Sequence, residues 1–104
     1  MPEIKLESEY KDLDKYEDYY GNIFYLKKDT CTIHNPYGPA YISKNGVKIY
    51  IINEKYHRLD GPAIIYTNGK EEYWINNKNL SKEKFETHPE RLKYLGKEYL
   101  ICLK

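Results

Sequence analysis

The chain has 104 residues, with 17 Lys and Arg against 16 Asp and Glu, and 40% of its residues are hydrophobic. That length fits one domain with a thin core, and a net charge of +1 argues against a dedicated nucleic-acid binder, which would carry a basic excess. No apolar run approaches a membrane span or a signal peptide, and two cysteines are too few for a disulfide scaffold, so we expect a cytoplasmic protein.

Residues 1–20 are acidic, with seven Asp and Glu against three Lys, whereas residues 21–104 carry a net charge of +5. Helical spacing is followed by Leu6, Tyr10, Leu13, Tyr16 or Glu17, and Tyr20. The segment is either an acidic amphipathic helix lying on the basic remainder or a partly ordered acidic tail. The apolar stripe favours the helix, which we expect to cap the N-terminal end.

The middle of the chain contains an internal repeat with a constant offset of 23 residues. Gly38-Pro39-Ala40 recurs as Gly61-Pro62-Ala63, and Asn45-Gly46 recurs as Asn68-Gly69. At least nine positions match, in the pattern His-x-x-x-Gly-Pro-Ala-x-Ile-x-x-Asn-Gly-x-x-x-Tyr-x-Ile-Asn-x-Lys. One offset over so many positions indicates a repeated structural unit.

Asn-Gly between β-rich segments predicts a hairpin with a type I′ turn, in which both central residues have positive φ. We therefore expect residues 40–44 to pair with 47–52, and residues 63–67 with 70–75. This register places Ile42 and Ile49 on one face of the first hairpin and Tyr41 and Tyr50 on the other. A degenerate unit around Gly21-Asn22 and residues 23–26 predicts a further hairpin or its second strand.

The C-terminal segment carries helix signals. Ser81 is a candidate N-cap for a short helix through Phe85, and Thr87 a candidate N-cap for a second, with Glu90 completing a capping box. Gly96 would end that helix. Residues 99–103 then predict a final buried strand.

Together these elements predict a mainly β fold with small α caps, a meandering antiparallel sheet of stacked hairpins in a single domain, 1–104. Residues 1–20 form the acidic N-terminal cap, 21–80 the hairpin repeats, and 81–104 the C-terminal helical cap and last strand. Open sheet edges would allow homo-oligomers.

The repeat resembles the MORN family. More specifically, the chain is similar to MORN-variant proteins of bacteriophages and large DNA viruses. The similarity lies in segments 57–63, 68–69, 73–76 and 80–85, the first of which reads His57-Arg58-Leu59-Asp60-Gly61-Pro62-Ala63. The resemblance covers roughly residues 34–86, and it departs from ordinary MORN repeats in having His-x-x-x-Gly-Pro-Ala where His-Gly-x-Gly is usual. It implies a platform that binds proteins or lipid head groups rather than an enzyme. Phage proteins of this size are often inhibitors of host systems, so we expect a phage or viral protein that inhibits a host defence protein.

His34 and His57 occupy equivalent positions of the repeat. The two imidazoles would form a metal or acid–base pair if stacking brought them together. Otherwise each hydrogen-bonds the backbone at the turn that enters Gly-Pro-Ala. Residues shared by repeats are usually structural, and no Cys or carboxylate stands nearby at ligand spacing, so we expect no metal site.

Arg58 and Asp60 replace Asn35 and Tyr37 of the first unit. Arg58 either pairs locally with Asp60 or remains available for a carboxylate or phosphate of a partner. The chain also has 13 Tyr against 2 Phe and 1 Trp. Tyrosines on a sheet either pack across strands or, where uncovered, form a binding surface. The candidate binding residues are His57, Arg58, Asp60, Tyr41, Tyr50, Tyr66, Tyr73 and Trp74.

No catalytic motif is recognisable: the serines lack a nucleophile elbow, the glycines form no phosphate loop, and we expect no catalytic residue and no cofactor. Cys31 and Cys102 are expected to be free, buried thiols. We therefore expect a non-enzymatic module that binds a host protein. The alternatives are a protein that sequesters a nucleotide or other small ligand, and a platform on anionic membranes, whose electrostatic basis is weak at this net charge.

Overall fold

The computed structural model describes residues 10–96, and this part of the chain is mainly β. Its elements are β1 (Leu13–Glu17), β2 (Ile23–Lys27), β3 (Tyr41–Ile42), β4 (Lys48–Ile49), β5 (Ile51–Ile52), β6 (Lys55–Tyr56), β7 (Ile64–Ile65), β8 (Glu71–Ile75), β9 (Lys78–Leu80), α1 (Lys82–Glu86) and α2 (Pro89–Tyr94). Seven strands form an antiparallel sheet in the order β1-β2-β3-β4-β7-β8-β9, and β5 pairs with β6 separately. The mainly β fold with small helices is confirmed.

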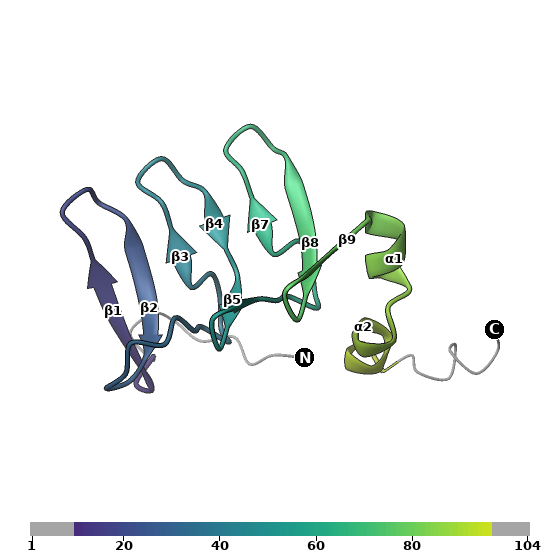
Figure 1. The fold of residues 1–104 in the computed structure, drawn as a ribbon, viewed down its shortest axis with the longest axis horizontal. Coiled ribbons are helices and arrows are strands. Elements are labelled where there is room, and N and C mark those ends of the chain that lie inside the picture. Colours follow the sequence, from purple (N-terminus) through teal and green to yellow (C-terminus); the bar gives the residue numbers. More distant parts are fainter. Residues whose placement is uncertain (1–9, 97–104) are drawn as a thin grey trace.

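Three hairpins, β1–β2, β3–β4 and β7–β8, lie side by side, and both helices follow β9 at one end (Figure 1). The backbone hydrogen bonds of the second and third hairpins are equivalent at the 23-residue offset. Ser43 N donates to Val47 O and Tyr66 N to Lys70 O, each over 2.9 Å. The repeat in the sequence is therefore a repeat of backbone geometry.

The predicted type I′ turns at Asn45-Gly46 and Asn68-Gly69 are wrong. Only the glycines have positive φ, +100° at Gly46 and +89° at Gly69. Gly46 N donates to Ser43 O over 2.9 Å, so a three-residue loop ends in a left-handed glycine, the type I turn with a bulge. In the second unit the Asn68 side chain accepts from Lys70 N, an Asx-turn that this loop accommodates.

Further along each unit, after the strand that follows the Asn-Gly loop, two consecutive residues have positive φ. Asn53 and Glu54 have φ of +51° and +65°, and Asn76 and Asn77 have +49° and +69°. These pairs connect β5 to β6 and β8 to β9. Type I′ turns therefore form at Asn53-Glu54 and Asn76-Asn77, where the motif reads Tyr-x-Ile-Asn, and not at Asn-Gly.

The extra loop residue shifts the predicted register by one. Tyr41 is opposite Ile49, whereas the two-residue turn would have placed it opposite Tyr50. A one-residue slip exchanges the faces of the returning strand, so the predicted face assignment is wrong. Tyr41 and Ile49 share a face, and Tyr50 lies on the opposite one with Ala40.

The corrected register gives the two faces different contents. One face carries an unbroken cross-strand row, which we call the aromatic row: Tyr16, Phe24, Tyr41, Ile49 and Ile64 are successive direct partners. The opposite face carries Ala40 and Ala63, both fully buried. The cleft described below is lined by Tyr50 from that second face, by loop residues of both repeats and by Tyr94 of α2.

The helix predicted over residues 1–20 is wrong for its second half. Leu13–Glu17 is strand β1 and pairs along its whole length with β2, for example Tyr16 with Phe24. Cross-strand packing of aromatic side chains therefore overrides the helical spacing. Residues 1–9 lie outside the described residues.

Ser81 caps α1 as predicted, because its side chain accepts from Lys84 N. The second helix begins one residue later than predicted: His88 is its N-cap and accepts from Glu90 N, while Thr87 closes α1. Gly96 follows the helix with φ of +74°. The predicted final strand, 99–103, lies outside the described residues.

Candidate functional site

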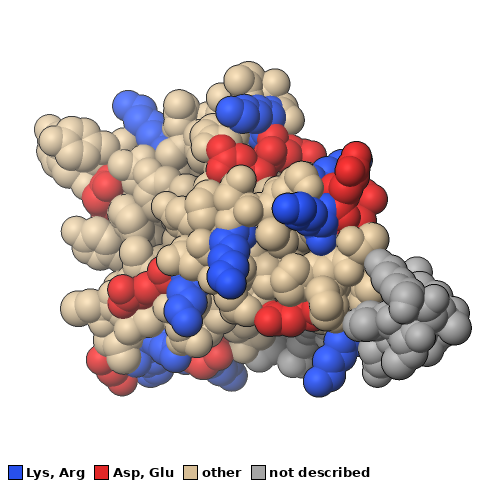
Figure 2. Space-filling model, turned by 45° about the vertical axis from the view of Figure 1, so that its right-hand side comes forward, with Lys and Arg blue, Asp and Glu red and all other residues tan. Residues whose placement is uncertain are grey.

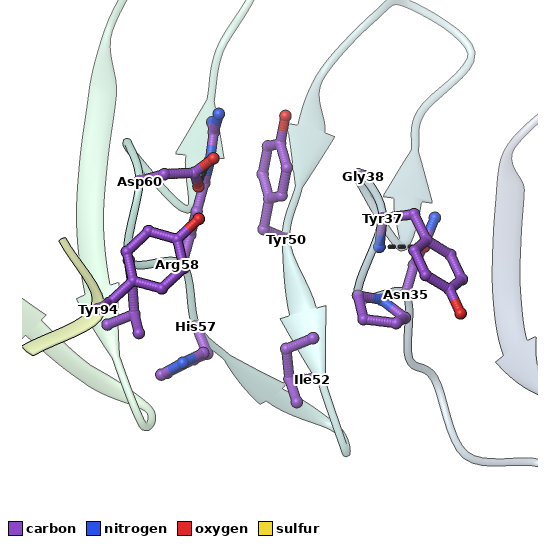
Figure 3. A pocket seen from close by; sticks show the side chains of 11 residues that line it. Asn35, Tyr37, Gly38, Tyr50, Ile52, His57, Arg58, Asp60 and Tyr94 are labelled. Atoms are coloured by element: carbon purple, nitrogen blue, oxygen red, sulfur yellow. Dashed lines mark hydrogen bonds and ion pairs between the residues drawn. The ribbon is translucent and has the colours of Figure 1, made fainter. Parts of the chain in front are cut away.

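A cleft of about 210 Å³ lies between the equivalent loops of the two clean repeats. Residues 35–38 line one side and residues 57–60 the other, with Tyr50 and Ile52 between them and Tyr94 of α2 at the edge. Figure 3 shows the Tyr50 ring between Arg58 and Asp60 on one side and Tyr37 on the other. The repeat thus builds the cleft by placing the same loop twice.

The Arg58 guanidinium is fixed by three contacts. Its Nε donates to Asp60 Oδ1 over 2.9 Å, its Nη1 donates to Pro62 O over 3.0 Å, and its central carbon lies 3.9 Å from the centroid of the Tyr50 ring. The side chain is 21% exposed and that of Asp60 is 42% exposed. At such exposure the ion pair itself adds about 0–1 kcal/mol, so its main effect is to orient the guanidinium.

The first unit meets the same backbone requirement with an amide. Asn35 Nδ2 donates to Pro39 O over 3.0 Å, just as Arg58 Nη1 donates to Pro62 O. Asn35 is buried, and its Oδ1 accepts from Tyr37 N. Arg58 serves the carbonyl with one of its five N–H donors. Its Nη2 group and second Nη1 N–H have no hydrogen-bond partner within residues 10–96.

The two glycines of Gly-Pro-Ala stand in different surroundings. A Cβ on Gly61 would lie 2.9 Å from Arg58 Cζ, closer than real Cβ contacts. A Cβ on Gly38 would meet Tyr10 Oη at 3.6 Å, an ordinary contact. In the second unit, therefore, the glycine gives room to the guanidinium.

His34 and His57 have the same structural role. Nδ1 of each accepts a backbone N–H over 3.0 Å, from Asn53 and Asn76 respectively. The structural interpretation is correct in kind, but the acceptor serves the left-handed turn 19 residues later rather than the turn at Gly-Pro-Ala. Because Nδ1 accepts, the proton of the neutral ring is on Nε2.

Burial lowers the pKa of both histidines. At His57 the burial effect exceeds the opposing effect of Glu90, and at His34 the charge of Lys27 adds to it while Asp12 opposes it. Both rings are therefore neutral near pH 7, as the acceptor role of Nδ1 requires. Within residues 10–96, no three His, Cys, Asp or Glu side chains group so as to hold a metal ion.

Tyr94 contributes a hydroxyl that sequence reasoning did not select. Its Oη is shielded from solvent and has no hydrogen-bond partner within the described part of the chain. Burial raises the pKa of Tyr94, and the charge of Asp60 raises it further, against the opposing charge of Arg58. The hydroxyl thus remains protonated. No local pattern could have indicated it, because α2 brings it to the cleft by tertiary packing.

The eight candidate binding residues divide into two groups. Tyr50, His57, Arg58 and Asp60 meet in the cleft. Tyr41 belongs to the aromatic row and lies 4.9 Å from Phe24 between ring centroids, while Tyr73 packs on Phe85 of α1.

Tyr66 and Trp74 are fixed by a common acceptor. Tyr66 Oη donates to Glu72 Oε2 over 2.9 Å, and Trp74 Nε1 donates to Glu72 Oε1 over 3.0 Å. These two bonds, the one from Tyr66 first, lower the pKa of Glu72. Hydrogen bonds to Glu72 therefore account for the placement of both aromatic side chains.

Within residues 10–96, the most exposed aromatic residues lie in the first half of the first hairpin, in the segment up to Tyr20 that the sequence predicted as a helix. Tyr16, Tyr19 and Tyr20 are 57%, 96% and 71% exposed. Tyr19-Tyr20 precedes Gly21 in the turn, where the other hairpins have Lys44-Asn45 and Thr67-Asn68. Alignment of the three turns on their left-handed glycines would have revealed this difference.

Asp18 holds the turn that carries Tyr19 and Tyr20, which we call the Tyr19–Tyr20 tip. Its Oδ1 accepts from the backbone N–H of Tyr20 and Asn22, each over 2.9 Å. The bond from Asn22 is the largest cause of a lowered pKa at Asp18. Two exposed tyrosines thus stand on a turn that the backbone and one carboxylate hold in place.

The remaining surface carries both charges. On the face drawn in Figure 2, Lys and Arg are interspersed with Asp and Glu. No helix within residues 10–96 is long and apolar enough to cross a membrane. Cys31 is free but exposed, which corrects the prediction that it is buried, and Cys102 lies outside the described residues.

No protein-family model matches the chain, and neither a curated protein nor a solved structure matches it significantly. The MORN resemblance therefore stays an expectation from the sequence.

Proposed function

We propose that this chain is a non-enzymatic protein-binding module whose contact surface is the Tyr19–Tyr20 tip together with the aromatic row. The observation that supports it is the exposure of three tyrosines on one hairpin, with Tyr16 continuing directly into Phe24 and Tyr41. Tyrosine supplies large contact area at low cost in side-chain entropy and is common at binding hot spots. The rings of Tyr19 and Tyr20 contact each other edge to face at 5.4 Å, and little of either residue is buried, which favours binding.

The partner we expect is a protein, and the resemblance to viral MORN variants adds the expectation of a host protein that is inhibited. Neither nucleic acid nor an anionic membrane is favoured, because the net charge is +1 and the charged side chains of the visible face are mixed (Figure 2).

Site-specific photo-cross-linking tests the proposal. A benzophenone amino acid replaces Tyr20 in one variant and Asn68, at the tip of the third hairpin, in the matched control. In cells that naturally make the protein, we expect a discrete protein adduct from position 20 that is absent from position 68. Adducts of equal pattern at both positions, or none at position 20, would contradict the proposal.

A second candidate is sequestration of a small ligand, favoured by the cleft with its oriented Arg58. Thermal denaturation against a panel of nucleotides tests it, because a ligand at 100 times its Kd stabilises the folded state by about 2.7 kcal/mol. The volume of about 210 Å³ is below the roughly 300 Å³ of ordinary ligand pockets, so a whole nucleotide would not be enclosed.

A further inference from the structure

We infer that the cleft between residues 35–38 and 57–60 is a receptor for a carboxylate group of the protein partner, with Arg58 as the binding residue. The inference rests on the proposed protein-binding function and adds a second contact to it, because Tyr50 and the cleft lie on the face of the sheet opposite the aromatic row. Its starting point is the difference between two loops that share one backbone geometry.

The two repeats show which hydrogen bond the loop needs and which donors of Arg58 are additional to it. An asparagine amide is sufficient to satisfy the proline carbonyl, as Asn35 does at Pro39. At the equivalent position Arg58 does the same work and adds a positive charge and further N–H donors. The fold does not require these additions.

The surplus donors are held in a defined plane. Asp60 fixes Nε, Pro62 O fixes Nη1, and the Tyr50 ring supports the flat side of the guanidinium at 3.9 Å. The edge formed by Nη1 and Nη2 is the part with unused N–H groups, and two parallel N–H bonds from such an edge match a carboxylate. Orientation before binding reduces the entropy that the ligand contact must offset.

The other uncommitted polar groups of the lining are also mostly donors. Neutral His57 carries its proton on Nε2, and the Tyr94 hydroxyl is protonated and without a partner within residues 10–96. Among the described residues, Asp60 is the one carboxylate that lines the cleft. A ligand group that accepts several hydrogen bonds and carries negative charge complements this set.

The size of the cleft limits what accompanies the carboxylate. About 210 Å³, bordered by Tyr50, Ile52 and Leu59, has room for one side chain or one chain end. Two sources share the chemistry: an Asp or Glu side chain, and the C-terminal carboxylate of a partner whose last residue is apolar.

NMR titration can test the inference without knowledge of the partner. The chain has two arginines, Arg58 and Arg91, so the side-chain Nε–Hε region holds two signals. Arg91 Nη1 donates to Leu59 O of the cleft loop over 2.8 Å, so direct binding at Arg58 should shift the Arg58 signal more than the Arg91 signal. The probes are N-acetyl-phenylalanine for a chain end, N-acetyl-glutamic acid α-amide for an acidic side chain, and N-acetyl-phenylalaninamide, which lacks the carboxylate. We expect a saturable shift of the Arg58 signal with at least one carboxylate probe and none with the amide.

The matched variant is Arg58→Asn, which installs the residue that the first unit uses and can keep the bond to Pro62 O. We expect it to fold and to weaken the probe at least about tenfold, the loss typical of a hydrogen-bonded charged contact. Asp60→Asn removes the competing negative charge and should strengthen carboxylate binding. Weaker binding in Asp60→Asn, equal shifts with acid and amide, or no shift in the wild type would overturn the inference. The cross-linking result at Tyr20 would be unaffected by any of these outcomes.

Discussion

The first and second clean repeats share their backbone hydrogen bonds, their left-handed turns and their histidine acceptor, yet they differ at the loop that borders the cleft. The first unit uses Asn35, a buried amide whose hydrogen bonds are all directed at its own loop. The second uses Arg58, which donates to the equivalent carbonyl and has further N–H groups without a partner within residues 10–96. One repeat therefore serves as an internal reference for the other, because it shows what the shared loop needs in order to fold.

We expect the largest loss of stability from a substitution at Asn35. Asn35→Ala removes the partners of Tyr37 N and Pro39 O inside a buried loop and should lower the free energy of unfolding by about 2–3 kcal/mol. Arg58→Asn keeps the equivalent bond and should cost about 1 kcal/mol or less. Urea denaturation measures both. Equal losses would mean that the arginine is as structural as the asparagine.

Glycine substitutions sharpen the same contrast. Gly61→Ala brings its Cβ to 2.9 Å from Arg58 Cζ, so the guanidinium, the end of a flexible side chain, should move away from Tyr50 at a cost of about 1 kcal/mol. Gly38→Ala, the matched control, meets only an ordinary contact and should change stability by less than about 0.5 kcal/mol. Thermal unfolding of the two variants gives the comparison, and a loss at Gly38→Ala as large as at Gly61→Ala would refute it.

The left-handed turns give a third contrast. Glu54 has φ of +65°, which a long side chain disfavours, whereas its equivalent Asn77 tolerates +69°. Glu54→Gly should therefore stabilise the protein by about 0.5–1 kcal/mol. Asn77→Gly should instead destabilise it by about 1 kcal/mol, because the Asn77 side chain accepts a hydrogen bond from Tyr56 N over 3.2 Å. The change in Tm of each variant checks this order; a larger gain at Asn77→Gly would reverse the explanation.

The smallest effect is the dependence of stability on pH. Burial holds the pKa of His34 and His57 below the ordinary value of about 6.5, so as pH falls the unfolded chain takes up these protons first. Their contribution is complete above about pH 7 and decreases as pH falls below about 6.5. Between pH 7 and 5.5 we expect a fall in Tm that is reduced in the double variant His34→Gln, His57→Gln. An identical slope in both proteins would contradict the acceptor role.

The sequence predicted the repeat, the hairpins and the Ser81 cap because each depends on residues close together. The turn type and the face assignment failed together, since Asn-Gly also fits a three-residue loop and one extra residue exchanges the faces. Strand β1 was hidden because Leu13 and Tyr16 also fit a helix, and only pairing with β2 distinguishes the two.

At the site, local spacing predicted the pair of Arg58 with Asp60, which the structure contains. Their place beside Tyr50 was not foreseen, because it follows from the shifted register. Tyr94 reaches the same cleft through the packing of α2, which no sequence pattern near it indicates.

A crystal structure of the protein with the carboxylate probe that shifts the Arg58 signal tests the central claim most directly. We expect the carboxylate of the probe within about 3 Å of Arg58 Nη1 and Nη2, the distance of a charge-assisted hydrogen bond. A probe seated elsewhere, or one that leaves the Arg58 edge to water, would contradict it.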